Sequence, residues 1–248
     1  MKKFLVAAAV ATSIMIPSLA LAAEGTNSPY TDAVGDIDPG ISSGGGTLDI
    51  LGMEVTNNAT DITFTLSLNG NISTTDWGNF MIGISTGSTA STNTGNGWAR
   101  PIQLNSPVGG MDYWVGSWVN GGGGSQLWSY NGTSWDGPAA LAGYSLAAGA
   151  TSTITYTMTL SSLGLSVNDV FYFDAYSSGS GAGDSAIDAL ANPNVSITDW
   201  SQAYTSSTTG DGGVGLNSYQ VVPEPSTYAL LALSATALGG YVMRRRRR

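Results

Sequence analysis

The sequence of 248 residues contains no cysteine and no histidine. The absence of cysteine excludes disulfides, thiol nucleophiles and thiolate metal ligands. The absence of histidine excludes Ser-His-Asp triads, Cys/His zinc sites and the usual histidine-ligated haem. Carboxylates are the groups that remain for acid–base catalysis or for metal binding.

Basic residues are scarce outside the two ends of the chain. Residues 24–222 contain one, Arg100, against 16 acidic residues, which gives this region a formal charge of −15. Such a region repels polyanions. We therefore exclude nucleic acid as a partner.

The first 22 residues have the layout of a secretory signal peptide. Lys2 and Lys3 precede an apolar run that ends in the small-residue site Ala20-Leu21-Ala22. We predict cleavage after Ala22, so that residues 23–222 form the exported domain. The alternative is a retained membrane anchor. The apolar run is short for a membrane-spanning helix, which disfavours this alternative.

Three features follow one another at the C-terminus. Pro223, Glu224 and Pro225 precede an uncharged stretch at residues 226–243, and a cluster of arginines ends the chain. The cluster consists of Arg244, Arg245, Arg246, Arg247 and Arg248. A helix over 226–243 would be about 27 Å long, which fits the core of a bilayer, and arginines prefer the cytoplasmic side. We predict a transmembrane helix with the arginines as its stop signal.

This order of features resembles the PEP-CTERM sorting signal of Gram-negative bacteria, over residues 223–248. The resemblance implies that exosortase, a membrane transpeptidase-like enzyme, processes the chain at the inner membrane. It also implies a final place on the cell surface or in the extracellular matrix, among exopolysaccharide and biofilm components. An ordinary single-pass anchor after a chance Pro-Glu-Pro is the alternative.

The exported domain is predicted to be all-β. Residues 61–68 (DITFTLSL) and 153–160 (TITYTMTL) alternate apolar side chains with threonine and serine, which is typical of half-buried strands. Further short candidate strands are separated by segments rich in Gly, Asn and Asp, and no long helical period precedes the tail. We predict a single β-sandwich or jelly roll of about eight to eleven strands.

The order of these strands resembles that of DOMON-like domains and family-nine carbohydrate-binding modules. The resemblance rests on TDAVGDIDPG, on the hairpin DYWVGSWV to SQLWSYNGTSW, and on VFYFDAYSSG to DSAIDAL. It implies a sandwich that binds sugar or haem. Because haem binding in that group depends on histidine and methionine ligands, the lack of histidine favours the sugar branch.

Tryptophans are the candidate carbohydrate-binding residues. Trp114 and Trp118 lie four residues apart in one expected strand, so both point to the same face, and Trp77 and Trp98 lie beside glycine-containing loops. Flat indole rings suit the apolar faces of sugars. We predict that these four tryptophans bind carbohydrate; the alternative is that they fill the core.

Three aspartates lie close together in the early segment DAVGDID. Asp32, Asp36 and Asp38 form an oxygen-rich group in a flexible stretch, which suits Ca²⁺ outside the cell. Their spacing is not that of an EF-hand. Because of the oxygen-rich group, we predict a structural calcium site. The alternative is that the three aspartates are solvated loop residues, and no other cofactor is expected.

Two classes of function compete for the exported domain. It is either a non-catalytic module that binds matrix polysaccharide or a structural surface protein without a small ligand. An enzyme is not expected, because a carboxylate-dependent glycosidase would need a pair drawn from aspartates that no local motif selects. These are Asp112, Asp136, Asp174 and Asp188. Asp174 is the one acid in an apolar strand, and its pKa would be raised if it pointed inward. We expect the simpler arrangement, in which it faces outward to solvent.

Overall fold

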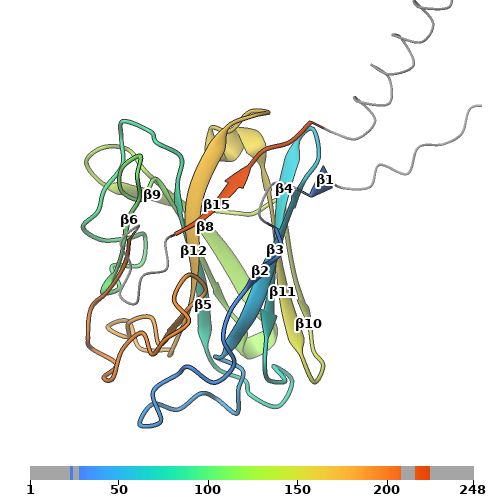
Figure 1. Ribbon diagram of the computed structural model, residues 1–248, viewed down its shortest axis with the longest axis vertical. Helices are drawn as coiled ribbons and strands as arrows, with labels where there is room; N and C mark the ends of the chain where they lie inside the picture. The colour runs from blue at the N-terminus through green and yellow to red at the C-terminus, as the bar shows by residue number, and fades with distance from the viewer. Residues whose placement is uncertain (1–22, 25–27, 208–215, 224–248) are drawn as a thin grey trace, which may run out of the picture. The chain divides into compact units, whose positions relative to one another are not determined.

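The computed structural model describes residues 23–24, 28–207 and 216–223, which form strands in two large antiparallel sheets. The two sheets lie face to face in Figure 1, with β3, β4, β11 and β10 in one and β12, β5, β8 and β9 in the other. The predicted all-β sandwich is thus confirmed. The described residues contain fifteen strands, more than predicted, because several two-residue strands and one extra pair are not visible in the sequence pattern.

The first sheet has six strands in the order β1-β3-β4-β11-β10, with β2 also paired to β3. Its strands are β1 (Ala23–Glu24), β2 (Tyr30–Thr31), β3 (Ile50–Asn57), β4 (Asp61–Leu68), β10 (Gly143–Ala147) and β11 (Ser152–Thr159). Burial alternates residue by residue along β4 and β11, as their alternating sequences predict. One face of this sheet therefore packs in the core and the other is partly exposed.

The second sheet has seven strands in the order β13-β12-β5-β7-β8-β9, with β15 also paired to β12. Its strands are β5 (Asn79–Ser85), β7 (Tyr113–Trp118), β8 (Gly124–Tyr130), β9 (Trp135–Ala139), β12 (Val170–Ser178), β13 (Asp188–Ala189) and β15 (Asn217–Gln220). Two short 3-10 turns, Asn120–Gly122 and Leu160–Leu163, connect strands. In β5 and β12 nearly every residue is buried, because both faces of this sheet are covered.

Aromatic rings fill the space between the two sheets. Phe64 of β4 meets Phe171 and Phe173 of β12 edge to face, with ring centroids 6.0 and 5.7 Å apart. Such pairs add to the free energy gained from burying their area. The hydroxyl of Tyr156 in β11 also hydrogen-bonds the hydroxyl of Ser117 in β7, at 2.8 Å.

A short parallel pair covers the other face of β12. It consists of β6 (Ile102–Asn105) and β14 (Tyr204–Ser207), and β6 lies beyond the seven-stranded sheet in Figure 1. Ser206 bonds both the carboxylate of Asp174, at 2.5 Å, and the hydroxyl of Tyr176, at 2.9 Å. The expectation that Asp174 faces solvent is therefore wrong: this third layer buries it completely.

Candidate metal centre and aromatic pocket

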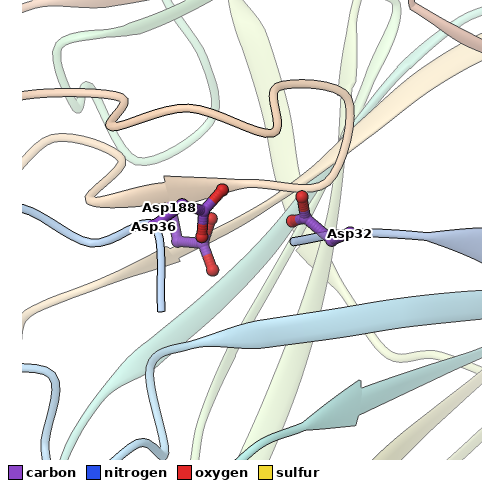
Figure 2. A group of neighbouring side chains, drawn as sticks. All are labelled: Asp32, Asp36 and Asp188. Atoms are coloured by element: carbon purple, nitrogen blue, oxygen red, sulfur yellow. The ribbon is translucent and has the colours of Figure 1, made fainter. Parts of the chain in front are cut away.

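Three aspartates from two distant parts of the chain meet at one end of the sandwich. Asp32 and Asp36 lie in the segment after β2, and Asp188 begins β13. Each offers a carboxylate oxygen, and these oxygens all lie within 4.8 Å of one another. Figure 2 shows the carboxylates of Asp36 and Asp188 side by side, with that of Asp32 pointing toward them.

Backbone hydrogen bonds hold two buried acids of this region in place. The carboxylate of Asp188 accepts from the amides of Ile50, at 2.6 Å, and Ala189, at 2.8 Å, which ties β13 to the start of β3. The carboxylate of Asp49 accepts from the amide of Gly35. Gly35 has a φ of +79°, a conformation that suits glycine, so the chain can turn between Asp32 and Asp36.

Several carboxylate oxygens of the cluster have no hydrogen-bond partner. In the described part of the chain, this holds for Oδ2 of Asp32 and for both oxygens of Asp36, and all three atoms are buried. Burying a charge without a partner is costly. Burial, followed by the neighbouring carboxylates, accordingly raises the pKa of Asp32 and of Asp188, while burial raises the pKa of Asp36 to about 6.

These groups form the kind of site that a hard cation prefers. Calcium takes carboxylate and carbonyl oxygens, and its charge would offset the repulsion among the three acids. Arg100, the one basic residue of the described ranges, hydrogen-bonds elsewhere. Within the described ranges, the cluster therefore lacks a neutralising side chain.

The structure brings together two of the three predicted metal ligands. Asp38 lies outside the cluster, because its Oδ1 accepts from the amide of Gly40, at 2.7 Å, in a local turn. Asp188 takes the third position. The sequence analysis considered Asp188 only as an acid of the segment DSAIDAL and as one of four candidate glycosidase acids, since nothing local indicates that it lies beside Asp32.

In EDTA, the protein is expected to lose stability as the pH rises from about 4 to 7. The pKa of Asp36 is raised to about 6 and that of fully buried Asp174 to about 7, so the folded state binds more protons than the unfolded state across this range. The stability contributed by proton uptake is present at low pH and is lost as the pH passes these values. Thermal melts in EDTA across this range show whether the melting temperature falls as the pH rises. Asp36→Asn should make the melting temperature depend less on pH. A melting temperature that rises with pH would contradict the raised pKa values of Asp36 and Asp174.

A second feature, the aromatic pocket, lies on the outer face of the seven-stranded sheet. It is a hollow of about 470 Å³ lined by Asn79, Trp98, Arg100, Trp118, Asn120, Gln126, Ser180 and Ala182. Trp118 projects from β7 and its ring lies over Gly124 of β8, where a Cβ would come within 2.2 Å of the indole. The missing side chain therefore makes room for the ring to lie flat on the sheet.

Trp98 is fixed at the side of the pocket by several contacts. Its ring lies over Gly116 of β7 and edge to face with Trp114, with centroids 6.4 Å apart. Its indole N–H donates to Oε1 of Gln126, at 2.9 Å. Trp98 and Trp118 are both half-buried, so each keeps exposed indole surface at the pocket.

The other two predicted carbohydrate-binding tryptophans lie elsewhere. Trp114 points to the same face of β7 as Trp118, as predicted, but it is 0% exposed and stacks on Tyr176, with centroids 6.1 Å apart. The assignment of Trp114 as a binding residue is therefore wrong, because the covering layer leaves no face for a ligand. Trp77 is half-buried beside Gly44, away from the pocket lining. Sequence reasoning missed Gln126, Asn79 and Arg100, which become neighbours only in the fold.

The C-terminal residues 221–248 match the PEP-CTERM protein-sorting motif. This motif indicates export and exosortase-dependent sorting to the cell surface, so the chain is an exported, sorted β-sandwich protein. A comparison with curated proteins finds no match. Of the matched residues, the structure describes only 221–223.

The predicted membrane helix over 226–243 and the arginine cluster lie outside the described residues. Within residues 23–24, 28–207 and 216–223, no helix has the length and apolar character needed to cross a membrane. The transmembrane helix therefore stays a prediction.

Proposed function

We propose that the exported sandwich is a non-catalytic carbohydrate-binding domain, which associates the sorted protein with exopolysaccharide of the biofilm matrix. The observation that carries the proposal is the aromatic pocket. It combines two half-buried indoles, Trp98 and Trp118, with amide side chains at its wall. Aromatic surface with a few oriented polar groups is the usual composition of a site for sugar rings.

Gln126 is the best-oriented polar group of the pocket. Its Oε1 accepts from the indole N–H of Trp98, at 2.9 Å, and of Trp128, at 3.3 Å. Because an indole nitrogen can only donate, the carbonyl oxygen of Gln126 must face both rings. Its amide NH₂ group points away from them and has no partner among the described residues, so it is available to a sugar hydroxyl.

Asn79 adds an acceptor to the pocket wall. Its amide nitrogen donates to the carbonyl of Gly179, at 2.9 Å, which leaves its Oδ1 without a partner in the described part of the chain. Sugar hydroxyls both donate and accept hydrogen bonds. The pocket thus offers stacking surface, a donor and an acceptor, which supports a carbohydrate ligand over a purely structural protein without one.

The candidate acids for a glycosidase are engaged elsewhere. Asp174 and Asp188 are buried and accept backbone or serine hydrogen bonds, and Asp112 accepts from the amide and hydroxyl of Thr86. Asp136 accepts from the side chain of Asn131. None of the four lines the aromatic pocket. This arrangement supports a binding role for the pocket rather than hydrolysis.

We further propose that the cluster of Asp32, Asp36 and Asp188 holds a structural Ca²⁺. The proposal is supported by the three buried carboxylate oxygens that lack hydrogen-bond partners among the residues that the structure describes. A bound cation would clamp the segment after β2 to β13. The cation would stabilise the domain, whereas the carbohydrate would bind at the aromatic pocket.

Trp118→Ala is expected to weaken polysaccharide binding by about 1–3 kcal/mol, roughly 5- to 150-fold, by analogy with other aromatic stacking platforms. Its melting temperature should change little, because the indole lies on the sheet surface and is not part of the core. Affinity electrophoresis of the full chain, in an uncharged detergent and in gels that contain polysaccharide, measures the effect.

Trp77→Ala is the matched control, since it removes a half-buried indole outside the pocket. It should leave the binding unchanged. If no polysaccharide retards the unmutated chain, the carbohydrate-binding proposal fails and the structural alternative stands.

A further inference from the structure

Arg100 lies in the wall of the aromatic pocket, and three of its five N–H donors are engaged within the fold. Its Nη1 donates to the hydroxyl of Ser178, at 2.7 Å, and to the carbonyl of Asp184, at 2.9 Å; its Nη2 donates to the carbonyl of Gly179, at 3.1 Å. The guanidinium carbon also lies 5.5 Å from the ring centre of Trp98. Recognition of a carboxylate by arginine usually takes two parallel N–H donors. The bonds made by Arg100 leave no such pair free at Nη1 and Nη2.

Two aspartates outside the pocket lining, here called the rim aspartates, hydrogen-bond the segments that line the same pocket. Oδ1 of Asp76 accepts from the amide of Gly121, at 3.2 Å, next to the lining residue Asn120. Oδ2 of Asp184 accepts from the amide of Gly181, at 2.8 Å, between the lining residues Ser180 and Ala182. A ligand in the pocket would therefore lie near two negative charges.

The remaining polar groups of the pocket are neutral. They are the amides of Asn79, Asn120 and Gln126 and the hydroxyl of Ser180. The surrounding region, residues 24–222, carries a formal charge of −15. Both the local rim charges and the field of the domain therefore oppose an acidic ligand.

We propose that the aromatic pocket selects uncharged sugars and rejects acidic ones, and that Asp76 and Asp184 cause the rejection. This inference rests on the proposed carbohydrate-binding function and specifies its ligand class. Neutral hydroxyls meet the amides of the pocket, while a uronate or a similar acidic sugar would place its carboxylate near two others, beside an arginine whose Nη1 is already fully engaged.

The test compares neutral polysaccharides with forms of the same backbone that carry carboxymethyl groups. The full chain, in an uncharged detergent, is run in gels that contain hydroxyethyl cellulose, galactomannan or dextran, and in gels that contain the carboxymethylated form of each. At low salt, the acidic form should bind at least about tenfold more weakly than the neutral form. Added NaCl should narrow the difference, because salt screens the repulsion.

The double variant Asp76→Asn/Asp184→Asn identifies the cause. It should bind the acidic polymers more tightly than the unmutated chain and bind the neutral ones equally well. The control variant, Asp61→Asn/Asp169→Asn, makes the same change in net charge outside the pocket lining and should leave the discrimination nearly intact.

The other outcomes separate the two proposals. Equal or tighter binding of the acidic form by the unmutated chain overturns the selectivity but leaves carbohydrate binding in place. Discrimination that survives in the double variant overturns the role of the two rim aspartates. Binding to none of the polymers removes the carbohydrate-binding function itself.

Discussion

Calcium at about a hundred times its dissociation constant is expected to stabilise the folded protein by roughly 2.7 kcal/mol, if one ion binds only the folded state. For a domain of this size, the melting temperature should rise by about 5–10 °C. The reason is the cluster of Asp32, Asp36 and Asp188, in which three buried oxygens have no hydrogen-bond partner among the described residues. Thermal melts in EDTA and in millimolar calcium at pH 7.5 measure the difference.

Asp36→Asn gives this prediction a distinctive signature. In EDTA the variant should melt at a higher temperature than the unmutated protein, because it removes a buried, repelled carboxylate whose pKa is raised to about 6. In calcium, the variant should show little of the stabilisation that calcium gives the unmutated protein, because the substitution removes a ligand. An aspartate that served only in local packing would not show both effects.

Asp38→Asn is the matched control for the calcium experiment. It makes the same charge change in the same segment, and the amide oxygen can still accept the hydrogen bond from Gly40. It should keep the full response to calcium. Identical melting temperatures of the unmutated protein in EDTA and in calcium would eliminate the metal site.

Trp114→Ala is expected to cost about 3–5 kcal/mol of unfolding free energy, a large share of the stability of an ordinary domain. The side chain is 0% exposed and lies between the ring of Tyr176, which it stacks on, and the edge of Trp98. Its removal leaves a cavity beneath the pocket. Urea unfolding at constant pH and calcium concentration gives the free energy.

Trp114→Phe separates the packing contribution from the indole nitrogen. The Nε1 of Trp114 is buried and has no hydrogen-bond partner in the described ranges, so phenylalanine loses part of the ring but also removes an unsatisfied donor. We expect it to cost clearly less than alanine. A loss below about 1 kcal/mol for Trp114→Ala would contradict the assignment of Trp114 to the core.

The strands of the six-stranded sheet could be predicted because their pattern is local. In β4, Ile62, Phe64 and Leu66 alternate with polar residues, and the structure buries them against the other sheet. One side of this sheet is partly exposed, so the period of two appears directly in the sequence. For β12 the same reasoning gave the wrong exposure for Asp174, because it assumed a solvated outer face, whereas β14 covers that face and Asp174 is 0% exposed.

The aspartate cluster could be predicted only in part. Asp32 and Asp36 are four residues apart, and the turn at Gly35 brings them together locally. Asp188 is distant in the chain and arrives through the pairing of β13 with β12 and its bond to the amide of Ile50. No sequence period indicates such a long-range contact.

The sequence by itself determined that the chain is exported and sorted and that its exported part is all-β. The sorting motif is an order of residues at one end, and the alternation of side chains is a property of each strand, so neither depends on distant contacts. Only the tertiary structure decided which tryptophans keep an exposed face and which acids share a site. Trp98 and Tyr176 pack against Trp114, and Ser206 of β14 covers Asp174, so both are buried. Trp98, Trp118 and Gln126 meet across neighbouring segments, because solvent exposure depends on everything that packs against a residue.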